Sequence, residues 1–233
     1  MLGRARLGYT CLMLAPKIAC GVALLLSLAG CALTDGHVHL NTSPQTSAAS
    51  GGAGREVIVF PVHDEREEQT RCGVKRNGFG AETANVLCEP DPSQWLGELV
   101  LRGLDRAGFK VVTTQTAKTA DPLRLRLGLK HLFIDQVNGA LTVALVTDAH
   151  VVIQAQTETG LSAERSFFAK SENDVLAVLD SGLQASMDEA VEKLADGIVD
   201  ALVGLNAKYP SAGSRVAVAR RPSTELARLE VRP

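Results

Sequence analysis

Three stretches in the second half of the chain alternate apolar and polar residues, which is the pattern of a β-strand with one buried face. The first begins at Leu123, the second spans Leu141 to Ile153, and the third spans Leu161 to Lys170. Val137-Asn138-Gly139 and Glu158-Thr159-Gly160 lie between them and favour three-residue hairpin loops, each with its glycine at the left-handed position. We therefore predict an antiparallel meander, with Val151 close to Phe167.

The two faces of this meander differ in character. Odd positions are largely apolar and predict the core face, where we expect His131 as a hydrogen-bonded core or rim residue. Even positions are mostly polar but also carry a set of apolar and aromatic residues, which predicts a surface for a partner or for self-association. Its members are Leu132, Ile134, Ala144, Val146, His150, Val152 and Phe168. Ordinary exposed apolar residues explain the pattern nearly as well.

Apolar residues at helical spacing predict two helices. The first begins after Asp91, which is followed by Pro92 and by Gln94 at capping-box spacing, and ends at Gly108. The second is a long amphipathic helix of about 22 residues beyond Gly182, since its apolar stripe continues to Leu205. Ser171 is expected to cap a short helical turn before it.

Two further strands complete the predicted domain. Residues 56–62 are a short apolar run bounded by charge, and residues 109–113 follow the first helix after a single glycine. This order of elements predicts an α+β fold, a single mainly antiparallel sheet with two helices packed on one face. Residues 56–206 would form that one domain.

The N-terminal region has the parts of a bacterial lipoprotein signal. Basic residues precede an apolar segment from Ile18 to Leu28, which is too short to span a bilayer. Leu28, Ala29 and Gly30 then lead to Cys31, so residues 1–30 look like a signal peptide. A signal peptidase that recognises these three residues would cut before Cys31 and leave the lipidated cysteine at the N-terminus. An uncleaved membrane anchor is the alternative. Met13 would give a signal of more usual length than Met1.

The residues after Cys31 bear on where the chain is held. Ala32 follows Cys31, at the position where an aspartate retains enterobacterial lipoproteins in the inner membrane. By analogy, we expect this protein at the periplasmic face of the outer membrane. Two or three acyl chains would hold the protein there stably. Residues 31–55 are rich in Ser, Thr, Gly and Ala, which predicts a flexible tether.

The net charge argues against nucleic-acid binding, and the local charge distinguishes the C-terminal residues from the rest of the chain. Without residues 1–30 the chain loses three of its 24 basic residues and keeps 26 acidic ones, which gives 21 against 26 and a net charge of −5. We therefore expect no nucleic-acid partner. Residues 207–233 are basic and predict a disordered tail, with a contact to anionic lipids or an acidic partner as the alternative.

The cysteine count indicates one disulfide bond. Cys11 and Cys20 leave with the signal and Cys31 is lipidated, so that Cys72 and Cys88 remain. An even pair in an oxidising compartment favours a disulfide over free thiols.

Other residues that suggest chemistry are weak candidates. His37 and His39 form an H-x-H, but two ligands in a tether make a poor metal site. The acidic run from His63 to Glu68 is typical of a solvated loop. Residues 73–80 are typical of a turn-rich loop rather than of a phosphate-binding loop. The histidines lie in no recognisable catalytic motif, so we expect no enzyme, no metal and no cofactor.

Several short motifs resemble the YajG family of bacterial lipoproteins. They are Lys75-Arg76-Asn77-Gly78-Phe79-Gly80, Trp95-Leu96 and Gly108-Phe109, together with the long hairpin and the final helix. With the lipobox, the resemblance covers most of the chain after residue 30. It implies a small periplasmic α+β lipoprotein that supports an envelope assembly or transport machine, and it implies no catalytic residues.

The sequence therefore predicts a lipid-anchored, non-catalytic binding or assembly component of an outer-membrane or transport complex, with an envelope protein as partner. An exposed sheet face or an edge strand would recruit that partner. The alternatives are a carrier of a lipid or another apolar ligand between sheet and helices, and a periplasmic hydrolase. Nothing in the sequence decides the oligomeric state.

Overall fold

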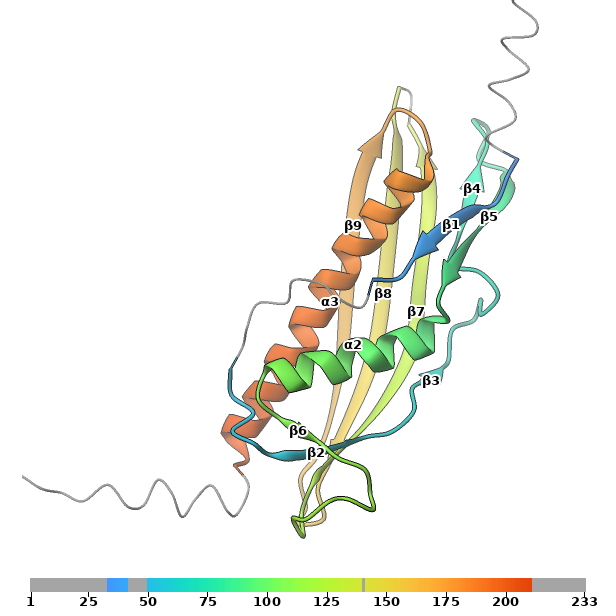
Figure 1. Ribbon diagram of the computed structural model, residues 1–233. Coiled ribbons are helices and arrows are strands. Elements are labelled where there is room, and N and C mark those ends of the chain that lie inside the picture. Colours follow the sequence, from blue (N-terminus) through green and yellow to red (C-terminus); the bar gives the residue numbers. More distant parts are fainter. Residues whose placement is uncertain (1–32, 42–49, 140, 211–233) are drawn as a thin grey trace, which may run out of the picture.

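A computed structural model of the protein describes residues 33–41, 50–139 and 141–210. In these residues two helices lie on one face of a single nine-stranded sheet (Figure 1). The helices are α2 (Pro92–Arg106) and α3 (Asp180–Lys208). The strands are β1 (Gly36–His39), β2 (Glu56–Val59), β3 (His63–Asp64), β4 (Gly73–Arg76), β5 (Glu82–Glu89), β6 (Lys110–Val111), β7 (Leu123–Asn138), β8 (Val143–Gln156) and β9 (Ser162–Val175).

The predicted meander is present as β7, β8 and β9. Each strand pairs antiparallel with the next along its whole length, and Val151 lies opposite Phe167 as expected. Glu158-Thr159-Gly160 forms the predicted loop, with Gly160 at a φ of 108°. The other hairpin differs from the prediction, because Asn138 pairs with Val143 and the amide of Gly139 donates to the backbone oxygen of Thr142, so Val137 and Asn138 belong to β7 and not to the loop.

The rest of the sheet corrects the predicted fold class, because the sheet is mixed and not mainly antiparallel. β2, β3 and β4 each pair parallel to successive parts of β7, and β1 pairs parallel to β5. β4 and β5 form an antiparallel hairpin where a turn-rich loop was predicted. These strands have two to eight residues. Their pattern of apolar and polar residues indicates which residues are buried but not the direction of the neighbouring strand.

Both helices bury their apolar faces against the sheet. Asp91 caps α2 by accepting hydrogen bonds from the amides of Ser93 and Gln94, and Gly108 follows the helix at a φ of 83°. α3 is longer than predicted, with 29 residues, and its stripe from Leu183 to Leu202 is buried. The two helices also contact each other, so they close one continuous core over the sheet.

Residues 171–175 continue β9 and do not form the predicted helical turn. Ser171 is buried, and its hydroxyl donates to the backbone oxygen of Ser186 on α3 over 2.6 Å. The hydroxyls of Thr147 and Ser186 lie 2.7 Å apart. A serine hydroxyl can cap a helix or form a hydrogen bond in the core. Ser171 forms the hydrogen bond in the core, because its partner on α3 lies within reach only in the folded chain.

A bulge in β7 reverses the predicted faces of that strand beyond Lys130. Leu129 pairs with Val151, but His131 already pairs with His150, so Lys130 is an extra residue. Odd residues point into the core before the bulge, and Leu132 and Ile134 do so after it. The predicted placement of these two on the outer face is therefore wrong, as is that of His131 on the core face.

Part of the predicted tether belongs to the sheet. Gly36–His39 form β1, and residues 50–55 carry the buried Arg55, whose guanidinium donates to Asn206 of α3 over 3.2 Å. Parallel pairing with β5 holds β1 in place, a contact with residues 50 positions away that local composition does not reveal. Within the described residues, neither helix has a stretch apolar enough to cross a membrane.

Candidate binding surface

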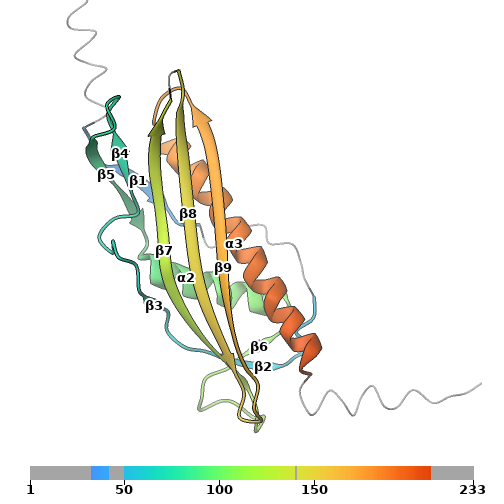
Figure 2. The same ribbon diagram turned by 180° about the vertical axis from the view of Figure 1, so that it is seen from behind.

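The side of the meander that faces away from the helices is the candidate functional site, and we call it the outer sheet face. Figure 2 shows β7, β8 and β9 in front of both helices, with no described helix over this face. His150 and Phe168 are opposite each other on β8 and β9, and their rings stack with centroids 4.0 Å apart. Phe168 remains 74% exposed, so that a large aromatic ring is presented on a rigid sheet.

Two cation–aromatic pairs flank this stack. The guanidinium of Arg126 on β7 lies 5.4 Å from the centre of the Phe60 ring, and that of Arg71 lies 5.9 Å from the centre of the Phe133 ring. The bulge explains why Phe133 is on the outer side. Sequence reasoning missed Phe60, Phe133 and His131 as members of this face, because each depends on the bulge or on a contact between distant segments.

A surface hollow of about 660 Å³ lies beside the aromatic stack. Residues 60–65 form one wall and the three strands form its floor. Gly128 is part of this floor, and the Glu65 carboxylate approaches to 2.5 Å of the position that a Cβ atom of residue 128 would take. The lining residues are Phe60, Pro61, His63, Glu65, Arg126, Leu127, Gly128, Lys130, Val152, Gln154 and Glu164.

The electrostatics of the face keep His150 uncharged. Burial lowers the pKa of its imidazole, and the nearby charges of Lys130 and His131 lower that pKa further. Its Nε2 atom is buried and has no hydrogen-bond partner among the described residues. A neutral imidazole stacked on an exposed phenyl ring favours contact with apolar or aromatic groups over contact with anions.

The structure separates the predicted partner residues into two groups. Ala144, Val146, His150 and Val152 are half-buried on β8, and together with Phe168 they lie on the outer sheet face. Leu132 and Ile134 are at most 1% exposed and belong to the core. Five of the seven predicted residues therefore lie on the outer sheet face. Part of its aromatic character comes from residues that the alternating sequence pattern did not indicate.

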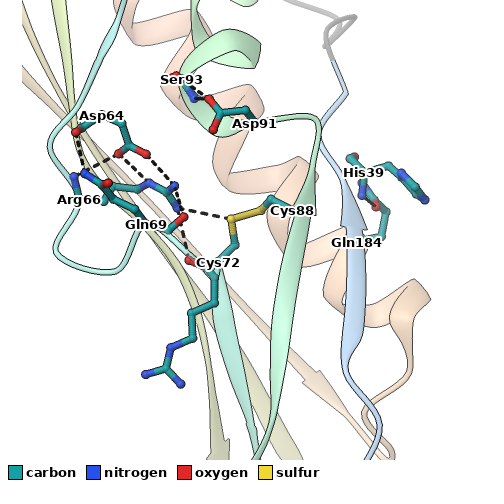
Figure 3. Close-up of a disulfide and its surroundings, with 10 residues drawn as sticks. His39, Asp64, Arg66, Gln69, Cys72, Cys88, Asp91, Ser93 and Gln184 are labelled. Atoms are coloured by element: carbon teal, nitrogen blue, oxygen red, sulfur yellow. Dashed lines mark hydrogen bonds and ion pairs between the residues drawn. A yellow bond between two sulfur atoms is a disulfide. The ribbon is translucent and has the colours of Figure 1, made fainter.

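The predicted disulfide joins Cys72 and Cys88, whose Cα atoms are 5.8 Å apart (Figure 3). Arg66 lies beside it, with one guanidinium nitrogen 3.6 Å from the Cys72 sulfur. The same guanidinium donates to both carboxylate oxygens of Asp64, over 2.9 and 2.8 Å, and to the backbone oxygen of Gln69. The acidic run predicted as a solvated loop therefore contains an ion pair between a buried arginine and a half-buried aspartate.

The H-x-H motif is on a strand and not in a free tether. The Nδ1 atoms of His37 and His39 lie 3.8 and 3.9 Å from the carboxylate of Glu89 on β5. Gln184 of α3 bonds the backbone of His39 in both directions. In the described part of the chain, no three His, Cys, Asp or Glu side chains are gathered in a metal-binding arrangement.

The space between the sheet and the helices is filled by side chains. Trp95, Leu96 and Leu104 of α2 and Met187 of α3 are fully buried there, against leucines of β7. The predicted alternative of an apolar carrier would need a chamber at this place. The predicted lipidation site Cys31 and its recognition residues Leu28, Ala29 and Gly30 lie outside the described residues.

Comparison with known proteins identifies the fold but no family. No protein-family model and no curated protein matches the chain. A solved Xanthomonas campestris protein described as DUF330 matches with a TM-score of 0.53 and 9% identity, over 74% of this chain and 98% of the other. A minor lipoprotein from Acinetobacter baumannii matches with a TM-score of 0.37 and 10% identity, over 66% and 94%. The first match shows that the fold is shared.

Proposed function

We propose that the protein is a lipid-anchored envelope lipoprotein that acts as a non-catalytic binding or assembly component. Cys31 would carry the lipid and hold the protein at the periplasmic face of the outer membrane. The lipobox residues Leu28 to Cys31 support the anchor. The disulfide between Cys72 and Cys88 supports a compartment outside the cytosol.

The observation that carries the binding role is the exposed Phe168 ring, stacked on His150 in the middle of a sheet face that no described helix covers. Aromatic side chains on rigid elements dominate the energy of many protein interfaces. Half-buried Val152 follows His150 on the same face of β8, and Val146 lies on that face beyond Asp148. An envelope protein with an apolar or aromatic patch is therefore the partner that fits this face.

Photo-crosslinking in cells tests the binding role. A photoreactive residue at Ser166 or Phe168 on β9 should capture one recurrent envelope protein. The same residue at Asp200, an exposed position of α3, serves as the matched control. Capture of the same proteins from Asp200, or of none from β9, would refute the outer sheet face as the binding surface. A lipid recovered with the protein would instead support a carrier.

The anchor has its own test. Intact-mass analysis of the membrane-extracted protein should show a chain that begins at Cys31 and carries acyl groups. A Cys31→Ser variant should lose them and leave the membrane fraction. If the variant remained in the membrane fraction, the lipid at Cys31 would not be the anchor.

A further inference from the structure

Exposed apolar side chains gather at one end of the molecule. Large apolar residues are exposed at five loop or terminal positions: Leu33 (67%), Phe79 (98%), Leu141 (91%), Leu176 (87%) and Leu179 (57%). They lie before β1, in the β4–β5 turn, in the β7–β8 turn and between β9 and α3. Figures 1 and 2 both show these connections at the same end of the sheet. We call these five residues the apolar end.

Hydrogen bonds and ion pairs hold the loops of the apolar end together. Asn138, at the end of β7, donates to the backbone oxygen of Asn77 in the β4–β5 turn over 2.5 Å. The buried amino group of Lys75 donates to the backbone oxygen of Thr34 over 3.2 Å and lies 3.5 Å from the carboxylate of Asp180, the first residue of α3. The chain before β1 is therefore fixed to this end.

The distance along the chain places this end close to the proposed lipid anchor. Leu33 is only two residues beyond Cys31, and two fully extended residues span about 7 Å. Exposed apolar side chains gathered in one place mark a contact surface for a protein or a membrane, and an anchored Cys31 would bring this surface to the lipid headgroups. We propose that the apolar end rests on the lipid surface in which Cys31 is anchored, so that Phe79, Leu141 and Leu176 contact the membrane interface.

This inference rests on the proposed lipid anchor and adds an orientation to it. The three long strands run away from the apolar end (Figure 1). With that end on the membrane, the strands stand upright and the outer sheet face points sideways, where a partner can reach it. The acyl chains supply the attachment, and the apolar end supplies a fixed direction.

Environment-sensitive fluorescence tests the orientation. Single cysteines at Gly78, Thr142 and Ala177 leave the apolar residues intact and can carry a nitrobenzoxadiazole label, since Cys72 and Cys88 are in a disulfide. The full lipidated chain is placed in phosphatidylcholine vesicles that contain a headgroup-level quencher. The labels at these three sites should be blue-shifted and quenched severalfold more than a label at Thr159, in the turn at the opposite end.

A matched variant separates the apolar end from the anchor. F79S/L141S/L176S should lose the shift and the quenching but still float with the vesicles through its lipid. F168S, which removes another exposed ring (74% exposed) from the outer sheet face, should keep both signals. Circular dichroism confirms that each variant is folded.

The remaining outcomes each decide one point. A lipidated chain that floats, with no more quenching at the three sites than at Thr159, overturns the orientation and leaves the proposed function standing. A chain without lipid on Cys31 overturns the proposed anchor and this inference with it. A blue shift that grows with the concentration of the C31S protein, without vesicles, would assign the apolar end to a second copy of the chain and overturn the membrane contact.

Discussion

Glu56 shows how much one side chain contributes through partners that are distant in sequence. Its carboxylate accepts hydrogen bonds from the backbone of Thr119 and Lys118 and from the hydroxyl of Thr119, over 2.8 to 3.0 Å. The amino group of Lys110 donates to it as well. The bond from the Thr119 backbone is the largest cause that lowers the pKa of Glu56 from 4.5 to about 2. The ionised carboxylate thus connects β2 to the chain after β6.

We predict that Glu56→Gln lowers the melting temperature at pH 7 and has little effect at pH 2. A carboxyl whose pKa is lowered by folding stabilises the protein above its unfolded pKa, and that stability is lost as the pH falls from about 4.5 to about 2. Thermal unfolding of both proteins between pH 2 and pH 7 measures the difference. A difference that stayed constant over this range would show that the charge of Glu56 is not its cause.

At the residue scale, the features that could be predicted are those that follow from the number of cysteines or from the spacing of nearby residues. Cys72 and Cys88 were paired because no other cysteines remained, and Asp91 was recognised as a cap because its partners follow within three residues. The ion pair between the buried Arg66 and the half-buried Asp64 was missed. Its setting beside the Cys72 sulfur is created by the fold, and a run of charged residues looks the same whether exposed or buried.

Among the elements, α2 offers two glycines, Gly97 and Gly108, of which only Gly108 has a backbone conformation that other residues rarely adopt. Gly108 ends the helix in a left-handed conformation with a φ of 83°. Gly97 lies within the helix, and a Cβ atom there would make an ordinary 3.5 Å contact with Val62.

We predict that Gly108→Ala destabilises the protein by about 1 kcal/mol, the cost of a left-handed backbone for an L-residue. Gly97→Ala, the matched control, should be neutral or stabilise by up to about 1 kcal/mol, since alanine favours helix. Urea unfolding measures both changes. Equal effects of the two substitutions would contradict the role of Gly108 as the helix terminator.

The disulfide stabilises the β4–β5 hairpin, and its removal is a second prediction for the elements. Replacement of Cys72 and Cys88 by alanine should cost roughly 3 kcal/mol, the loop-closure estimate for a loop of this length. Reduction of the unmodified protein with a phosphine should lower the urea midpoint similarly. If neither treatment changed the midpoint, the hairpin would be held by its strand pairing alone.

Helices and strands could be predicted where the periodicity of their apolar residues is visible within the segment itself. The meander, α2 and α3 follow from periodicity over ten or more residues, and all are present. The single extra residue Lys130 changes the phase of β7 and moves Leu132, Ile134 and His131 to the opposite faces. No local signal marks Lys130 as a bulge. The parallel strands β1 to β4 are short, and β7 determines where β2, β3 and β4 pair.

For the whole molecule, the main change from the sequence-based picture concerns the distance from the membrane. A flexible segment over residues 31–55 would let the domain move away from its anchor. β1 is paired to β5 and starts at Gly36, only five positions beyond Cys31, which corresponds to a span of about 17 Å in a fully extended chain. The proposed lipoprotein is thus held close to the membrane by its first strand.

The same geometry favours the interpretation of the basic tail that has no membrane contact. α3 begins at the apolar end and has 29 residues, which corresponds to a length of about 44 Å. Figure 1 shows its C-terminus at the opposite end of the sheet. The tail after residue 210 therefore starts about 40 Å from the proposed membrane contact, farther than the Debye length of about 8 Å at physiological salt.

We predict that deletion of residues 211–233, which removes five of the six basic residues after Leu205, leaves membrane association unchanged, because the deleted segment starts farther from the proposed membrane contact than the Debye length. Flotation of the full and shortened lipidated chains on vesicles with and without anionic lipid measures this directly. Weaker flotation of the shortened chain on the anionic vesicles alone would mean that the tail reaches back to the membrane and that the upright orientation is wrong. Unchanged flotation combined with loss of a crosslinked protein would assign the tail to an acidic partner away from the membrane.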